Sequence, residues 1–230
     1  MRHVPLALAL CLAAAPASAN SLSSTFTLAS DYLFDGISQT QNDPAFQASL
    51  DYGIAGFYAG LWTSNVDFGP GDPADQEIDI YGGYGQSYDS GWGWTAGFAR
   101  YTYTGAPSGY DYTEWTAGLT LPTSTTLAVW VADDDVLGGE AWRAKAKHSF
   151  ALPGEVSLDL EATRTEYDND GFGDFNHYQV GVSRSFGRVK AYLGYADTNL
   201  PAGSRVAANG DSLVDGRVLL SLATTVTWFE

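Results

Sequence analysis

Cysteine, lysine and arginine are scarce in this sequence of 230 residues. The single cysteine, Cys11, lies close to the N-terminus, so we expect no disulfide bond to stabilise the fold. Lys and Arg together number 11, against 27 Asp and Glu, which gives a formal net charge of −16. Because nucleic-acid binding depends on basic side chains that neutralise phosphates, we expect no nucleic-acid partner.

Long apolar runs are missing beyond the N-terminal segment. Residues 4–15 are mostly apolar, follow a basic start and precede the small residues at positions 17–19, which is the pattern of a secretory signal peptide. The run is too short for a transmembrane helix, which needs ~20 apolar residues. We therefore predict a signal peptide over residues 1–19, cleaved between Ala19 and Asn20, and export through the periplasm.

Alternation of apolar and polar residues recurs along the rest of the chain. In residues 156–162, Val, Leu, Leu and Ala alternate with Ser, Asp and Glu, and residues 46–52, 142–150 and 188–196 behave in the same way. This period of two indicates β-strands with two different faces. Aromatic residues make up 14% of the chain and there are 26 glycines, a composition that favours strands and turns. The sequence therefore predicts an all-β protein.

About twelve strands can be delimited in this way. Their lengths are those of tilted membrane strands, which need roughly 9–11 residues to cross a bilayer. The predicted strands are residues 22–34, 45–53, 57–67, 77–87, 92–103, 110–121, 125–132, 140–150, 155–166, 175–185, 188–196 and 212–229.

The connections between these strands alternate between long and short. An outer-membrane barrel has this pattern, with long extracellular loops at one end and tight periplasmic turns at the other. The alternative is a periplasmic β-sandwich or lipocalin-like barrel, in which the apolar set would face inward. We predict a transmembrane antiparallel up-and-down β-barrel over residues 20–230, in the outer membrane of a Gram-negative cell and surrounded by its lipid. The predicted long connections are residues 35–44, 68–76, 104–109, 133–139, 167–174 and 197–211.

Three sequence blocks resemble the TorF-type porin family. They are residues 30–40 (SDYLFDGISQT), 60–68 (GLWTSNVDF) and 77–84 (EIDIYGGY), in the order and spacing of that family. The resemblance covers the first third of the chain and implies an outer-membrane barrel of the porin kind without a defined substrate. Two positions depart from the pattern: Asp35 stands where a basic residue is more common, and Glu230 follows the terminal aromatic Phe229.

Charged residues on the polar faces of the strands are the candidates for lining a pore. No Lys or Arg lies between His3 and Arg100, so we expect one acidic wall and one mixed wall. If the lumen is wet, these charges are screened and select ions. If they instead pair, for example Lys145 with Asp159, they close the barrel. The candidates are Asp51, Glu77, Asp79, Arg143, Lys145, Lys147, Asp159, Glu161, Arg188, Lys190 and Arg217.

Two further arginines have the parity of the apolar, lipid-facing set. Arg100 and Arg164 lie toward the outer ends of their strands, where a lipid-facing arginine costs little. They are candidates for binding lipid phosphates, with simple snorkelling to the interface as the alternative.

The sequence offers no constellation for catalysis or metal binding. Only His148 and His177 remain after processing, too few for a matching triad. The acidic residues 133–135 and 168–174 are typical of solvated loops rather than of an EF-hand. We therefore expect no enzyme, no cofactor and no metal site.

A passive channel for small polar solutes or ions is the function that the sequence favours. The alternative is a non-conducting structural or adhesive barrel whose acidic loops bind a partner. The solute and the oligomeric state are left open.

Overall fold

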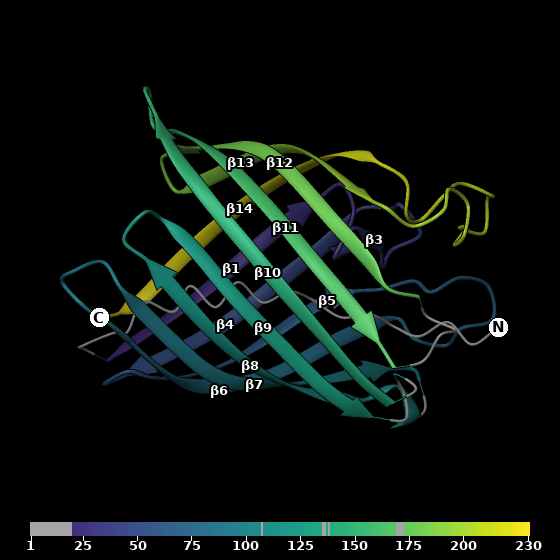
Figure 1. Cartoon of the computed structure of the whole chain (residues 1–230), viewed down its shortest axis with the longest axis horizontal. Helices are drawn as coiled ribbons and strands as arrows, with labels where there is room; N and C mark the ends of the chain where they lie inside the picture. Colours follow the sequence, from purple (N-terminus) through teal and green to yellow (C-terminus); the bar gives the residue numbers. More distant parts are fainter. Residues whose placement is uncertain (1–19, 107, 135–136, 138, 169–172) are drawn as a thin grey trace.

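The computed structural model describes residues 20–106, 108–134, 137, 139–168 and 173–230, so the predicted signal peptide lies outside the described residues. Twelve antiparallel strands close into one barrel, as predicted (Figure 1). The barrel strands are β1 (Ser21–Ala29), β4 (Ala45–Ile54), β5 (Phe57–Asn65), β6 (Gln76–Ser87), β7 (Gly93–Thr104), β8 (Tyr112–Leu121), β9 (Thr125–Asp134), β10 (Gly139–Leu152), β11 (Val156–Tyr167), β12 (Phe175–Phe186), β13 (Val189–Thr198) and β14 (Arg217–Phe229).

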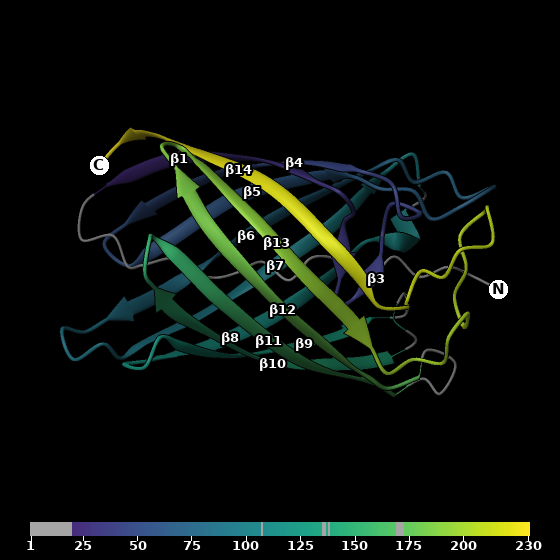
Figure 2. The ribbon, with the colours of Figure 1, turned by 90° about the horizontal axis from the view of Figure 1, so that it is seen from above.

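Each barrel strand pairs with its neighbours in the chain, and β1 closes the barrel by pairing with both β14 and β4. The tight connections and the C-terminus lie at one end, here named the turn end, and the long connections lie at the other, the loop end (Figures 1 and 2). A short 3-10 helix, η1 (Ser108–Tyr110), lies in one long connection. No helix among the described residues has the length and apolarity needed to cross a membrane.

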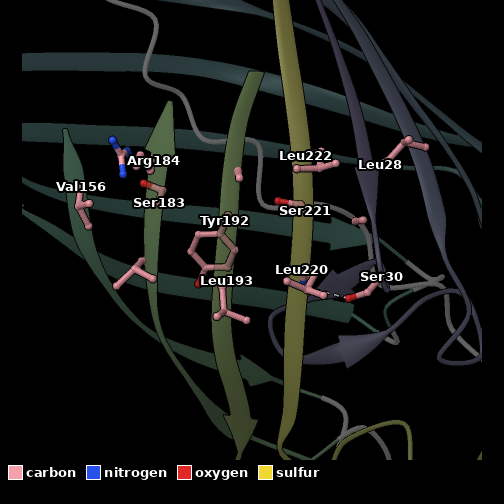
Figure 3. A pocket seen from close by; sticks show the side chains of 13 residues that line it. Leu28, Ser30, Val156, Ser183, Arg184, Tyr192, Leu193, Leu220, Ser221 and Leu222 are labelled. Atoms are coloured by element: carbon pink, nitrogen blue, oxygen red, sulfur yellow. Dashed lines mark hydrogen bonds between the residues drawn. The ribbon is translucent and has the colours of Figure 1, made fainter. Parts of the chain in front are cut away.

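The outer surface of the barrel is apolar. Large side chains such as Leu28, Ile80 and Val180 are exposed on it, and they alternate with residues that face the interior. A groove of about 560 Å³ on this surface is lined by leucines of β1, β13 and β14, among them Leu193 and Leu220 (Figure 3). A band of exposed apolar side chains around a polar interior is the pattern of a barrel that faces lipid.

The first predicted strand ends earlier than expected. It ends at Ala29. Ser30 still pairs with the backbone of Leu220 on β14: its N–H donates to the Leu220 carbonyl at 2.8 Å, and its hydroxyl oxygen accepts from the Leu220 N–H at 3.0 Å (Figure 3). The chain then turns into the barrel and forms a separate hairpin of β2 (Leu33–Phe34) and β3 (Ile37–Ser38), where a strand end and an external loop were predicted.

The turn of this hairpin explains why it forms. Asp35 and Gly36 have φ values of 43° and 85°, and a two-residue type I′ turn requires positive φ at both positions. Asp-Gly is a preferred pair for this turn, and here it is flanked by Leu33-Phe34 and Ile37-Ser38. We name residues 30–44 the inner hairpin segment.

The inner hairpin segment fills the loop-end half of the barrel. Phe34 and Ile37 are buried against Phe175 and Val214, and Tyr32 packs edge-on against Trp62. Two long connections hold the hairpin from outside: Asp67 donates its backbone N–H to the carbonyl of Gln39 at 2.8 Å, and Ser38 donates to Leu213 at 3.0 Å. The packed part of the interior is thus at the loop end.

Candidate functional site

The tip of the inner hairpin meets the wall at two cations of β10. The Asp35 Oδ2 atom lies 3.1 Å from Nη1 of Arg143, and Oδ1 lies 2.9 Å from Nζ of Lys145. The Asp35 side chain is 0% exposed. Two aromatic rings lie against the Arg143 guanidinium: its carbon is 4.4 Å from the ring centre of Phe34 and 4.9 Å from that of Trp130. The carboxylate is therefore held in a buried, two-cation site.

Carboxylates of the wall complete this ion network. Arg143 also pairs with Glu114, which accepts a 2.7 Å hydrogen bond from the Tyr101 hydroxyl. Lys145 and Lys147 both contact Glu161, at 2.7 and 2.8 Å. Asp35 is the carboxylate of the network that comes from the hairpin rather than from a barrel strand.

The environment of Asp35 keeps it ionised. Burial by itself would raise the pKa of this carboxyl group, but the Lys145 and Arg143 cations outweigh burial and hold the pKa below its usual range. Asp35 thus remains an anion at neutral pH.

Several polar atoms beside the two-cation site have no hydrogen-bond partner among the described residues. Thr165 and Thr163 lie directly opposite Arg143 and Lys145 on β11, and His177 lies opposite Thr163 on β12. These three side chains are buried. The atoms without a hydrogen bond are Nε of Arg143, Oγ1 of Thr163 and of Thr165, and both ring nitrogens of His177, of which Nδ1 lies 3.7 Å from Oε1 of Glu161.

Metal binding by this cluster is disfavoured by Lys145. Asp35, Glu161 and His177 offer ligand atoms within 4.8 Å of one another. However, Nζ of Lys145 contacts both carboxylates, so a protein cation already neutralises the position that a metal ion would take.

A cavity of about 480 Å³ occupies the turn-end half of the interior. Lys145 lines it and also contacts Asp35, so Lys145 lies at the boundary between the cavity and the hairpin. Polar and charged residues line it together with Trp130 and Ala128: Thr95, Thr120, Thr126, Lys145, Lys147, Ser149, Asp159, Glu161, Gln179, Lys190 and Tyr192.

The early strands contribute the acidic wall. Glu77 and Asp79 of β6 are both 0% exposed, and Glu77 accepts a 3.1 Å hydrogen bond from the Tyr32 hydroxyl. Asp51 accepts hydrogen bonds from Tyr81 and, at 2.7 Å, from Ser49. These three predicted residues thus lie inside the barrel, on strands that carry no cation.

The remaining predicted residues are distributed between the two ends. Asp159 accepts hydrogen bonds from Ser149 at 2.6 Å and Ser183 at 2.8 Å, so the predicted example of a Lys145–Asp159 pair is wrong. Arg217 lies at the loop end, where it contacts Asp31 at 2.8 Å.

Lys190 and Arg188 belong to the turn end. Lys190 lines the cavity there. Arg188 is not part of a strand as predicted, because β13 begins one residue later; it lies exposed in the turn.

The two predicted lipid-phosphate residues already have acidic partners. Arg100 lies 3.7 Å from Asp111, and Arg164 contacts Glu166 at 3.0 Å and Asp174 at 3.1 Å. Both side chains are partly exposed near the loop end.

Two carboxylates of the ion network, Asp35 and Glu114, are missing from the residues predicted from the sequence. Asp35 could have been found from the Asp-Gly hairpin signal, which marks residues 33–38 as a hairpin rather than an open loop. Glu114 shares the inward parity of Tyr112 and Thr116 on β8, so the alternation along β8 already places its side chain inside the barrel.

Comparison with known proteins places the chain in a family and identifies its fold. Two similar solved structures are the KdgM porin (10% identity, TM-score 0.57, 88% of this chain and 98% of that chain) and the NanC porin (10% identity, TM-score 0.56, 90% and 100%). At this identity they share the fold alone. No curated protein matches the sequence. The resemblance to the TorF-type porins stays a prediction. Residues 13–226 match the family described as "Bacterial protein of unknown function (Gcw_chp)", and the chain belongs to that family.

Proposed function

We propose that the protein is an outer-membrane channel for the passive diffusion of small polar solutes or ions, a porin as the TorF-type resemblance implies. The observation that carries the proposal is the closed barrel with an apolar outer surface and ionisable side chains inside it. Buried charges are costly and cores are ordinarily apolar, so a barrel that keeps charges on its inner wall is suited to a polar passage.

The inner hairpin segment makes this a closed state of the channel. Burial of Phe34 and Ile37 stabilises the closed position by ~1.5–3 kcal/mol for each side chain. Since each 1.4 kcal/mol corresponds to about a tenfold change in population, spontaneous opening is rare. We therefore expect brief, infrequent conducting steps rather than a permanently open pore.

A non-conducting barrel is the second candidate, and the packed loop-end half favours it. In that case the hairpin is a permanent part of the core, and the loops are the functional surface. Two acidic residues of the predicted loops, Asp135 and Asp170, lie outside the described residues, so this candidate draws its support from the hairpin alone.

Planar-bilayer recordings distinguish the two candidates. The wild type is compared with a double variant, Phe34→Ser and Ile37→Ser, which weakens the apolar anchors of the hairpin. The control is Val206→Ser, because Val206 is 51% exposed in a long connection. A channel gives conducting steps that are much more frequent in the double variant than in the control. If neither protein conducts although both are folded, the barrel is closed and the channel proposal fails. The reversal potential under a salt gradient then gives the ion selectivity.

A further inference from the structure

We propose that the two-cation site of Arg143 and Lys145 binds the carboxylate of a polyhydroxylated solute such as a sugar acid, and that Asp35 occupies this site as an internal competitor. The inference deepens the proposed channel function by assigning a solute class. Binding of the solute does not require the channel function, whereas passage of the solute through the barrel rests on it.

The contacts of Asp35 carry the carboxylate part of the inference. Arg143 and Lys145 hold both oxygens of one carboxylate, at 3.1 and 2.9 Å, in a buried position where charge-assisted hydrogen bonds are strong. Among the ion pairs of the described residues, the three cations of β10 meet two carboxylates from the wall, Glu114 and Glu161. The third carboxylate, Asp35, belongs to a hairpin outside the barrel sheet. Arg143 and Lys145 thus hold one carboxylate that the barrel wall does not itself supply.

The polar atoms that the hairpin leaves without partners indicate hydroxyl groups on the solute. Thr163, Thr165 and His177 are buried beside the two cations, and their side-chain polar atoms have no hydrogen-bond partner among the described residues. Nε of Arg143 is also buried and has no hydrogen-bond partner among the described residues. Buried polar groups ordinarily have partners, and both threonine hydroxyls and imidazole nitrogens can exchange hydrogen bonds with sugar hydroxyls.

The cavity provides the approach to the site. It reaches Lys145 from the turn end and is also lined by Trp130, whose ring offers a flat apolar surface beside polar groups. Pockets of this kind combine aromatic walls with a few placed polar groups. A solute carboxylate between Arg143 and Lys145 would take the position of Asp35, so the solute and the inserted hairpin exclude each other. A ligand that binds only the hairpin-displaced state shifts the protein toward it.

Calorimetric titration of the refolded full-length chain in detergent tests the proposal, with D-glucuronate as the probe and neutral D-glucose as its control. The variant is Asp35→Asn, because asparagine tolerates the positive φ at this position and removes the charge while keeping the size of the side chain. The matched control is Asp51→Asn, which removes an interior carboxylate that contacts Tyr81 and Ser49 instead. We expect Asp35→Asn to bind glucuronate at least tenfold more tightly than the wild type, Asp51→Asn to bind like the wild type, and glucose to bind to neither. Equal glucuronate affinity in the two variants overturns the proposal.

A second measurement does not depend on the folding of Asp35→Asn. Ile37 is 3% exposed, so a cysteine placed there by Ile37→Cys, in a chain that starts at Asn20 and so lacks Cys11, should react slowly with a hydrophilic maleimide. Glucuronate should accelerate the labelling severalfold by displacing the hairpin, and glucose should not. An unchanged labelling rate at saturating glucuronate contradicts the competition between solute and hairpin.

The two proposals fail in different ways. If Asp35→Asn binds glucuronate tightly but no variant conducts in bilayers, the channel function is wrong and the carboxylate site stands. If the variants conduct but glucuronate binds no more tightly to Asp35→Asn than to Asp51→Asn, the channel stands and the site is wrong.

Discussion

The carboxylate of Asp35 lies 3.1 Å from the guanidinium of Arg143, which is 108 residues further along the chain. This contact joins the first long connection to a strand on another part of the barrel wall. Because Asp35 lies at the hairpin tip, moving the hairpin would also remove a negative charge from beside the Arg143 and Lys145 cations. A change at either residue should therefore alter both the closure of the barrel and its electrostatics.

Gly36→Ala should open the barrel by disturbing the hairpin tip. Gly36 has a φ of 85°, and an added Cβ would collide with the side chains of Thr198 and His177. The left-handed conformation alone costs a non-glycine residue roughly 1–2 kcal/mol, and the collision adds to this cost. We expect more frequent conducting steps in planar bilayers with the barrel still folded.

The control for this change is Gly187→Ala in a tight connection at the turn end. Gly187 also has a positive φ, 63°, but nothing lies within 4 Å of an added Cβ. Gly187→Ala therefore has a similar cost for a non-glycine residue at positive φ, but it does not contact the hairpin. If both alanine variants conduct as the wild type does, the packing of the tip does not control closure.

Lys145→Gln should destabilise the barrel far more than Lys147→Gln. The Lys145 side chain is 4% exposed and contacts Asp35 and Glu161, so its loss leaves buried carboxylates short of a partner. Breaking a buried ion pair from one side costs about 3–5 kcal/mol. Lys147 is 32% exposed, and its loss leaves Glu161 paired with Lys145, so the cost should be close to the ~0–1 kcal/mol of a surface pair.

Urea unfolding in lipid vesicles measures this difference. The sequence-based expectation of a wet lumen, in which all such pairs are screened, predicts nearly equal free energies of unfolding for the two variants. A result of that kind would show that Lys145 is hydrated and that the ion network is weak.

Acidification should release the hairpin. The pKa of Asp35 in the folded state lies below its unfolded value of about 3.9, so its ion pairs contribute stability above that value and lose it as the pH falls through the folded-state pKa. Arg143 and Lys145 on β10, Glu161 on β11 and His177 on β12 lie around this carboxylate.

Bilayer recordings at decreasing pH test this prediction. The frequency of conducting steps should rise below about pH 4, the unperturbed range of an aspartate. Asp35→Asn should not show this rise in the frequency of conducting steps, because it carries no titrating group at the hairpin tip. An identical acid response in both proteins would assign the effect to other carboxylates.

Arginine on the two faces of β12 should report which face meets lipid. Val180 is 45% exposed on the outer surface, whereas its neighbour Gln179 lines the interior cavity at nearly the same depth. Val180→Arg should reduce the free energy of folding into vesicles by ~2–4 kcal/mol if the site lies near the bilayer midplane. Gln179→Arg should be tolerated, because it adds a cation to a polar cavity. Equal folding free energies would contradict the assignment of the faces.

The strand pattern was readable from the sequence because each barrel strand has one lipid-facing and one inward-facing set. The stretch from Val156 to Ala162 carries this alternation by itself, and β11 (Val156–Tyr167) contains it. Most predicted boundaries agree with the observed strands within a few residues, since glycines and polar turns interrupt the pattern locally. The inward direction of Arg143 and Lys145 follows from the same parity.

The partners of those charges could not be read in this way. Parity places a side chain on a face, but the register of two neighbouring strands decides which residues meet. Ser149 is opposite Asp159 and Lys147 is opposite Glu161, so Lys145 reaches Glu161 rather than Asp159. A shift in register leaves the composition of each strand unchanged, and strand composition therefore does not specify the pair.

The sequence by itself determined an all-β barrel with an apolar exterior and charges inside, because alternation is a local property and lipid imposes it on each strand. Only the tertiary structure decided what fills the interior. The direction of the hairpin at Asp35 and Gly36 depends on burial of Phe34 and Ile37 and on cations supplied by β10, which come together only once the barrel has closed. Long-range packing and ion pairing, rather than local periodicity, therefore determine how the interior is filled.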